Sequence, residues 1–417
     1  MNLLIKSATI IDNSSPFHLK KKDLLIENGY VKKIAASIKN STSIKEIKLE
    51  NLHISQGWFD TSVCFGEPGF EERETIENGL NTAAKSGFTA VAVNPNTYPV
   101  ADNKSTIEFI KNKGSKFATK LYPIGNLTKG ANSNDLAELF DMQNSGAIAF
   151  GDYNKPIDNA NLLKIGLQYA QNFDGLVLSF PQDSTIAGKG LVNEEKNSTK
   201  LGLSGIPNLA EELQIARDLF ILEYTGGKLH IPTISTAKSV KLIKDAKKKG
   251  LNVTCSVAAH HLVLTDDELH NFDANTKVLP PLRTLKDTKS LVKGLNEGVI
   301  DMITSDHNPI AIEHKKVEYE NAKFGSIGLE SLFGALNKVV KTETLIACLT
   351  TKPRTRFNIQ TTAIKEGNKA DFTLFNPNFE YEFTKSNILS TSKNAIFLNK
   401  LLNGKVYGII SNNKIVV

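Results

Sequence analysis

Eight short β-rich runs, separated by amphipathic stretches, occupy residues 54–358, and this alternation limits the chain to a few folds. The β-rich runs span residues 54–65, 89–94, 120–124, 147–152, 175–180, 228–234, 252–258 and 300–305. The stretches between them place apolar residues three to four positions apart, as helices do, at residues 72–86, 105–113, 161–171, 209–225, 237–248 and 286–296. This α/β pattern favours a closed parallel (β/α)₈ barrel, or TIM barrel, over an open doubly wound sheet.

The two ends of the chain lack this alternation. Residues 1–54 contain short β patterns with a turn at Asn28-Gly29, and residues 359–417 return to β patterns with a turn at Asn403-Gly404. We therefore expect residues 55–358 to form the barrel. Residues 1–54 and 359–417 are expected to form a small satellite β-sandwich built from both chain ends.

Composition excludes several classes of protein. The 40% apolar and 23% charged residues are ordinary for a globular chain, and no apolar run approaches the ~20 residues of a membrane span. The N-terminus lacks the pattern of a signal peptide, and the three cysteines are far apart, as is typical of the reducing cytoplasm. The net charge of +6 is spread along the chain, which argues against nucleic-acid binding. We expect a cytoplasmic protein.

In a barrel of this kind, functional side chains lie at the C-terminal ends of the strands. The segments to inspect are therefore residues 62–69, 94–97, 150–152, 180–183, 230–236, 260–261 and 305–310. Several of them contain motifs that resemble those of the dihydroorotase family, in its long bacterial-type branch. These motifs keep the family's order along nearly the whole chain and include residues 60–69, 74–76, 87–89, 94–97, 201–207, 280–283, 305–307 and 328–330.

The resemblance implies a barrel that holds zinc at its mouth. Its family reaction is the reversible cyclisation of N-carbamoyl-L-aspartate to dihydroorotate in pyrimidine biosynthesis. A metal-bound water attacks the ring amide, and an aspartate at the end of the eighth strand, matched here by Asp306, handles the proton. Zinc is needed because it lowers the pKa of water from about 15.7 to about 7.

This chain departs from the family at its metal ligands. The four histidine positions of the resemblance fall on Ser62, Cys64, Phe180 and Thr233, so all four imidazoles are absent. The acidic ligand after the fourth strand matches Asp152, and Asp306 is also kept. Two carboxylates and one thiol make a poor zinc site, because zinc prefers a tetrahedral set supplied mostly by histidine or several thiolates. We therefore expect no zinc and no other cofactor.

The substrate-side positions that the resemblance implies differ as well. The family's arginine after its first strand falls on Gly66, which removes a bidentate carboxylate clamp. An asparagine position falls on Leu279 and a histidine position on Ile310, while Asn96 is retained. The differences from the family lie at the positions that bind metal or substrate, whereas the scaffold motifs are kept. This distribution indicates selection for a folded barrel without the reaction, in which Asp306 is vestigial.

The remaining histidines and the thiol have simpler interpretations. His260 and His261 are adjacent, so at most one can point into the mouth, and a structural role is favoured for both. His230 is expected to be packed or hydrogen-bonded rather than a metal ligand. Asp306 beside His307 has the form of a catalytic dyad, but no activated water is expected nearby. Cys64 as a nucleophile would need a base that the sequence does not place close to it.

Three functions are open from the sequence. The first is a non-catalytic dihydroorotase homologue that acts as a structural or regulatory subunit, as a homodimer or with aspartate transcarbamoylase, a partner that the resemblance implies. The second is an active dihydroorotase, or a hydrolase of another cyclic amide, with an unusual site. The third is a sensor that binds a small molecule in the barrel mouth.

Overall fold

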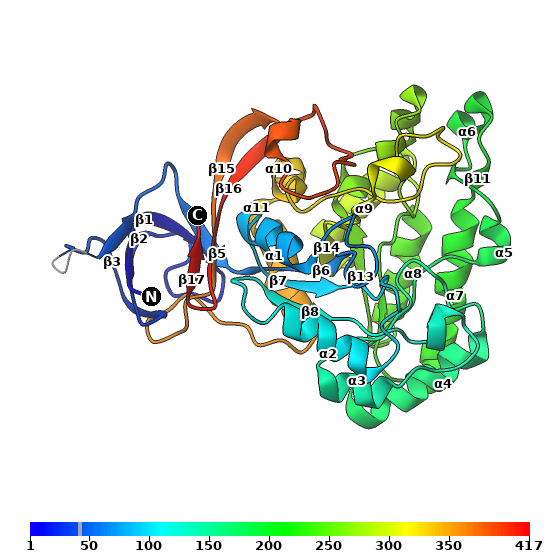
Figure 1. Ribbon diagram of the computed structural model, residues 1–417, viewed down its shortest axis with the longest axis horizontal. Helices are drawn as coiled ribbons and strands as arrows, with labels where there is room; N and C mark the ends of the chain where they lie inside the picture. Colours follow the sequence, from blue (N-terminus) through cyan, green and yellow to red (C-terminus); the bar gives the residue numbers. More distant parts are fainter. Residues whose placement is uncertain (41–43) are drawn as a thin grey trace.

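A computed structural model describes residues 1–40 and 44–417, and its central feature is a parallel barrel. Seven of the barrel strands form regular ladders: β6 (Trp58–Val63), β7 (Phe88–Val93), β8 (Lys120–Pro123), β9 (Val177–Leu178), β12 (Leu229–Ile231), β13 (Val253–Ala258) and β14 (Met302–Thr304). They pair in parallel as β6-β7-β8 and as β9-β12-β13-β14. Figure 1 shows the barrel with its layer of outer helices.

The fourth predicted strand joins these two sheets. Phe150 forms parallel bridges to Gly125 on one side and to Val177 on the other, without a longer ladder. On the opposite seam, Val63 pairs in parallel with His307, which closes the barrel between β6 and the end of β14. The eight β-rich runs of the sequence therefore form the eight strand positions of the predicted TIM barrel.

Helices follow the strands and cover the barrel. They include α1 (Ile76–Lys85), α2 (Lys104–Lys113), α3 (Leu139–Ser145), α4 (Ala160–Ala170), α7 (Asn208–Thr225), α8 (Ala237–Lys248), α9 (Leu285–Asn296), α10 (Leu332–Leu336), α11 (Thr342–Leu349) and α12 (Thr351–Arg356). Two shorter helices, α5 (Ser184–Ala187) and α6 (Lys196–Leu201), lie with the small ladder of β10 (Val192–Asn193) and β11 (Gly205–Ile206) in the loop after β9. Side-chain caps at Thr75, Asn103 and Thr236 accept bonds from backbone N–H groups of the first turns of α1, α2 and α8.

Both chain ends contribute to one satellite sheet. Its strands run in the order β17-β16-β15-β5-β1-β2-β3, with β4 also paired to β1. Their bounds are β1 (Leu3–Ile11), β2 (Lys21–Glu27), β3 (Tyr30–Ala35), β4 (Lys45–Ile47), β5 (His53–Gln56), β15 (Phe372–Glu382), β16 (Leu401–Ser411) and β17 (Lys414–Val416). The sheet encloses a separate apolar core that includes Ile5, Leu24, Ile54 and Phe372. Figure 1 shows this sheet and both termini at one end of the molecule.

One predicted strand, residues 54–65, is divided in the structure. β5 belongs to the satellite sheet and β6 to the barrel, and Gly57 lies between them. A Cβ atom at Gly57 would lie only 2.0 Å from Oγ1 of Thr89, so the chain passes between the two units where only glycine fits. A single apolar run therefore contributes to both parts of the protein.

Apolar side chains inside the barrel fill its lower part. Phe59, Ala90, Leu176 and Met302 pack there with Phe357, whose ring lies 5.7 Å from that of Phe59. Among residues 1–40 and 44–417, no helix has the length and apolar character required to cross a membrane.

Candidate functional site

A small cavity lies at the barrel mouth, where the C-terminal ends of the strands meet. Its volume is about 20 Å³, and its lining includes Ser62, Asn94, Tyr153, Phe180, Thr233 and Asp306, with Leu279 at its edge. That volume is close to the room that a single water molecule needs. The side chains that meet at the mouth therefore fill most of the space among themselves.

Ser62 and Cys64 project from the end of β6, and both are buried. The Ser62 hydroxyl faces Oδ1 of Asp306 at 3.4 Å and accepts a hydrogen bond from Nδ2 of Asn94 at 3.1 Å. The same amide lies 3.7 Å from Sγ of Cys64. Burial raises the pKa of the Cys64 thiol to about 12, so this sulfur stays protonated at neutral pH.

Asp306 is a buried carboxyl without a cationic partner. Its pKa is raised to about 7, first by burial and then by the nearby Asp60 carboxyl, and the Ser62 and Tyr153 hydroxyls limit the rise. Asp60 itself accepts bonds from the backbone N–H groups of Ser62 and Ser305, each at 3.0 Å, and burial raises its pKa to about 6. Because no Lys or Arg lines the cavity, a proton rather than a cation offsets the charge of Asp306.

Asp152 does not line the mouth cavity. Its Oδ1 accepts bonds from the backbone N–H groups of Leu127 and Thr128 at 3.0 and 3.1 Å and from Asn126 Nδ2 at 3.2 Å. Its Oδ2 accepts a bond from the Thr128 hydroxyl. The carboxylate therefore holds the loop after β8, and the structure places it with that loop rather than with the other predicted site residues.

Tyr153 enters the mouth instead, and the sequence analysis missed it. It lines the same cavity as Ser62 and Asp306. Burial, followed by the Asp306 charge, raises the pKa of this phenol well above its usual value. The sequence carries little signal for this placement, because Tyr153 lies beyond the strand with a left-handed φ of 58°, where the alternation of side chains along a strand no longer holds.

The other two positions at which the resemblance implies histidines are Phe180 and Thr233. Phe180 is buried and presents an apolar ring to the cavity. The backbone N–H of Thr233 donates to Oγ of Ser256 at 3.2 Å. These positions complete the mouth by packing and by a backbone hydrogen bond.

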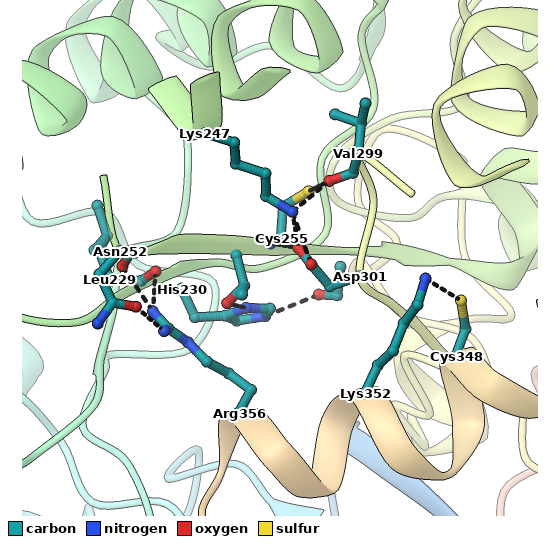
Figure 2. Close-up of polar contacts among 12 residues, drawn as sticks. Leu229, His230, Lys247, Asn252, Cys255, Val299, Asp301, Cys348, Lys352 and Arg356 are labelled. Carbon is teal, nitrogen blue, oxygen red and sulfur yellow. Dashed lines mark hydrogen bonds and ion pairs between the residues drawn. The ribbon is translucent and has the colours of Figure 1, made fainter. Parts of the chain in front are cut away.

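His230 lies deeper in the barrel and is fully engaged. Its Nδ1 pairs with the Thr254 hydroxyl at 2.9 Å and its Nε2 with the Ser256 hydroxyl at 3.2 Å. Figure 2 shows His230 with Arg356 nearby, whose guanidinium donates to the Leu229 carbonyl. Burial, with the charge of Arg356 next in importance, lowers the pKa of His230 well below its usual value. Its ring is a neutral, packed group, in agreement with the prediction.

The remaining histidines also have structural partners. Nε2 of His261 pairs with the carbonyl of Pro280 at 3.1 Å. His307 turns away from the Asp306 side of the mouth, because its Nδ1 accepts the backbone N–H of Gly328 at 3.2 Å. His260 and His261 lie in the 3₁₀ turn η3 (Ala259–Leu262) and do not line the cavity. None of the three rings therefore meets the predicted site residues there.

Zinc does not fit the residues at this mouth. The polar groups that line the cavity include hydroxyls, the Tyr153 phenol, the Asp306 carboxyl and the His230 ring, whose two nitrogens already pair with the Thr254 and Ser256 hydroxyls. Zinc sites instead use thiolates, imidazoles and carboxylates that are free to form a tetrahedral set. Over residues 1–40 and 44–417, no three His, Cys, Asp or Glu side chains come together in a group that could hold a metal ion.

Gly66 occupies a tight loop where no side chain has room. A Cβ atom there would lie 1.9 Å from the carbonyl oxygen of Phe70, and the Gly66 carbonyl accepts the Phe70 N–H at 2.6 Å. The family's arginine could not replace this glycine unless the loop moved. The loop itself, and not only one side chain, therefore differs from what binding of a substrate carboxylate by arginine would need.

A larger, open pocket lies outside the mouth. It has a volume of about 460 Å³ and contains Asn96, Ile310, Arg73 and Lys323, and Tyr153 lines both it and the inner cavity. Oδ1 of Asn96 is buried without a hydrogen-bond partner, whereas the backbone N–H of Ile310 donates to Asn394 Oδ1 at 3.1 Å. The predicted substrate positions Asn96 and Ile310 thus meet in the outer pocket, and Leu279 lines the inner one.

Three residues at the mouth have left-handed backbone conformations. Tyr153, Thr233 and Asp306 have φ values of 58°, 51° and 48°, in the region that residues with a Cβ rarely adopt. Such conformations cost of order 1–3 kcal/mol each. The same conformation occurs elsewhere in the chain, for example at Leu19 and Phe272, so it shapes the mouth without marking it as catalytic.

The amino-acid sequence matches two family profiles and many curated proteins. Residues 53–239 match the family described as Dihydro-orotase-like, and residues 194–416 match the Amidohydrolase family. A dihydroorotase from Pelotomaculum thermopropionicum is 38% identical over 423 residues, which cover 100% of this chain and 99% of that protein. A dihydroorotase from Syntrophus aciditrophicus is 37% identical over 425 residues, with 100% and 99% covered.

Solved structures share the fold at lower identity. L-hydantoinase (dihydropyrimidinase) from Arthrobacter aurescens superposes with a TM-score of 0.85 at 20% identity and covers 100% of this chain and 97% of its own. Dihydropyrimidinase from Brevibacillus agri gives a TM-score of 0.84 at 19% identity, with 100% and 95% covered. These likenesses confirm the predicted barrel fold.

Proposed function

The chain belongs to the dihydroorotase family of amidohydrolases, and we propose that it is a member that has lost zinc and the reaction and acts as a structural or regulatory subunit in pyrimidine biosynthesis. One observation carries the proposal: the Ser62 hydroxyl lies 3.4 Å from the Asp306 carboxyl and the Tyr153 phenol lines the same cavity, so hydroxyl groups occupy the place where the family's metal chemistry would take place. The proposal accounts for a complete scaffold around a mouth whose side chains do not form a zinc-binding set.

Physical chemistry supports the loss of activity. Attack on a ring amide needs a strong nucleophile at neutral pH, and water with a pKa near ~15.7 is a poor one unless a metal or base activates it. Asp306 is the one carboxyl that lines the inner cavity, and its pKa of about 7 would suit a general base, so the proposed loss rests on side chains that do not hold a metal to activate the water. The cavity of about 20 Å³ also leaves no room for a dihydroorotate ring beside it.

We propose aspartate transcarbamoylase, which precedes dihydroorotase in the pathway, as a partner. Self-association into a homodimer is compatible with that role. The test is to express both chains in one host, with an affinity tag on one of them. Copurification of the untagged chain with the tagged one would support this assignment. A chain that stays separate from the transcarbamoylase under those conditions contradicts it.

Metal content measured together with turnover tests the loss of the reaction. Purified protein is expected to hold far less than one zinc per chain after incubation with zinc and desalting. It is also expected to show no cyclisation of N-carbamoyl-L-aspartate above background at high enzyme concentration. The Pelotomaculum thermopropionicum relative, which is 38% identical, serves as the matched positive control. Stoichiometric zinc with turnover that Asp306→Ala abolishes would show instead that the chain is an active dihydroorotase or cyclic-amide hydrolase.

The outer pocket supports a second candidate function, which is binding without catalysis. Its volume of about 460 Å³ suits a small molecule, and Asn96 keeps an unpartnered oxygen within it. We propose thermal-shift measurements with dihydroorotate and N-carbamoyl-L-aspartate. A concentration-dependent rise in melting temperature that Asn96→Ala removes supports a sensor. No shift at millimolar ligand argues for the purely structural role.

A further inference from the structure

A small polar cavity lies where the satellite sheet meets the barrel helices. Its volume is about 70 Å³. One wall consists of residues 11–14, where β1 ends, and of Gln56, the last residue of β5. The opposite wall is the face of α11 that carries Glu343 and Ala347, which are four residues apart and therefore on one side of the helix. Figure 1 shows α11 on the side of the barrel nearer to the satellite sheet.

Gln56 brings a buried, unpaired oxygen to this cavity. The residue is only 5% exposed, and its Nε2 donates to Oδ1 of Asp12 at 2.8 Å. That bond fixes the orientation of the amide, because an ionised carboxylate accepts hydrogen bonds and cannot donate them. Oε1 of Gln56 therefore points away from Asp12, and among residues 1–40 and 44–417 it has no hydrogen-bond partner. A buried carbonyl oxygen left in this way favours a donor or a cation beside it.

The charge around the cavity is negative. Asp12 is buried, and its carboxylate accepts bonds from the backbone N–H groups of Ser14 at 2.9 Å and Ile364 at 2.7 Å, which carry no net charge. Glu343 adds a second carboxylate at the exposed rim, and α11 ends beside the cavity with the negative end of its dipole. Among the described residues that line the cavity, none is a lysine, an arginine or a histidine.

We propose that this cavity binds a hydrated divalent cation of the Mg²⁺ type. Asp12, Gln56 and Glu343 offer carboxylate and amide oxygens, which are the ligands that hard cations prefer. Mg²⁺ usually keeps several waters and is held by one or two carboxylates. A volume of about 70 Å³ leaves room for such waters, since a single water needs about 10–15 Å³. A water on the ion can then donate to Oε1 of Gln56.

A cation in this place joins the two parts of the protein. Gln56 belongs to the satellite sheet and Glu343 to a barrel helix, so an ion between them stabilises the packing of one on the other. The site has two carboxylates, so it does not conflict with the lack of any group of three His, Cys, Asp or Glu side chains over residues 1–40 and 44–417. It shares no lining residue with the mouth cavity, and the inference therefore does not depend on the loss of catalysis.

Thermal unfolding of the full-length protein tests the site. After treatment with a chelator and desalting, the protein is titrated with MgCl₂ in the millimolar range, with KCl added to keep the ionic strength constant. The melting temperature should rise by about 2 °C and reach a plateau, because an ion that binds only the folded state stabilises it. Glu343→Gln should remove this rise without harm to the fold, because Glu343 is exposed. Glu50→Gln, an exposed carboxylate of the satellite unit, is the matched control and should keep it.

Two further measurements locate the ion. Titration calorimetry should show about one Mg²⁺ bound per wild-type chain and none bound to Glu343→Gln. Asp306→Asn should bind Mg²⁺ as the wild type does, because Asp306 lines the mouth and not this cavity. Loss of binding in Asp306→Asn would place the ion at the mouth and overturn the proposal.

Two other outcomes would also overturn it. A wild-type melting temperature that is the same in Mg²⁺ and in K⁺ at equal ionic strength would mean that water alone pairs with Gln56. A Glu343→Gln variant that keeps the full response would mean that Mg²⁺ binds outside this cavity.

Discussion

Replacing Asp306 with asparagine should stabilise the protein, and the gain should grow with pH. Asp306 is buried, no Lys or Arg lines its cavity, and burial raises its pKa from 3.8 to about 7. The Asp60 carboxyl acts in the same direction, while Ser62 and Tyr153 donate hydrogen bonds that reduce the effect. Asparagine keeps the size of the side chain and removes the titration.

The magnitude follows from the two pKa values. At roughly 1.4 kcal/mol per pH unit, a rise from 3.8 to about 7 lowers the free energy of unfolding by up to about 4 kcal/mol once the group must ionise. Because the folded-state pKa is raised, the stability linked to the protonated form is fully present below pH 3.8 and is lost as pH rises through 7. The advantage of asparagine is therefore about 1.5 kcal/mol at pH 5 and about 4 kcal/mol at pH 8.

Urea unfolding of the wild type and of Asp306→Asn at pH 5 and pH 8 measures this difference. Any change in hydrogen bonding contributes equally at both pH values, so the increase of about 2.5 kcal/mol between them isolates the titration. Asp141→Asn, on the exposed side of α3, is the matched control and should show no such increase. An Asp306→Asn variant with the same effect at both pH values, or with a loss that grows with pH, would refute the assignment of a buried, uncompensated carboxyl.

Three further predictions concern the mouth and its support. Gly66→Ala should lower the free energy of unfolding by more than about 2 kcal/mol, because its Cβ would lie 1.9 Å from a backbone carbonyl oxygen. Gly250→Ala is the control: its Cβ meets open space, so it should cost about 1 kcal/mol in the same urea assay. Asp152→Ala should destabilise the protein by several kcal/mol, because it leaves the N–H groups of Leu127 and Thr128 unpaired. Hydrogen exchange at those two amides should become faster. Unchanged protection would contradict the role of Asp152 in holding the loop after β8. The thiols of Cys64, Cys255 and Cys348 should react slowly with an aromatic disulfide reagent at pH 8 in the folded state and completely after unfolding, because burial raises the pKa of each thiol. Rapid modification of one thiol in the folded state would contradict this expectation.

The barrel could be predicted because its evidence is local. Hydrophobic periodicity indicates each strand and helix, and the number of strands together with the length of the chain then favours a closed barrel. Closure itself is less visible in the sequence, because the fourth strand pairs with its neighbours over a short stretch around Phe150 and the barrel closes through a bridge between Val63 and His307. The division at Gly57 was missed because an apolar run looks the same whether it serves one sheet or two.

The site was harder to predict because it depends on where side chains point. The sequence identifies which residue types stand at the ends of the strands, and in the structure Ser62 lies 3.4 Å from Asp306. The sequence does not show that Asp152 turns to the loop after β8 or that Tyr153 lines the cavity. The direction of both side chains depends on the backbone after the fourth strand, where Tyr153 has a left-handed φ of 58°.

The satellite sheet joins the beginning and the end of the chain. β5 lies between β1 and β15, and the N-terminal amino group bonds Asn413 Oδ1 at 2.9 Å. During synthesis, the edge of β5 that pairs with β15 stays unpaired until residues 372–382 leave the ribosome, after the barrel residues have emerged. A chain that stops earlier would keep that edge unpaired and prone to aggregation. The two ends of this chain lie close together in one sheet, which is the arrangement that favours circular permutation.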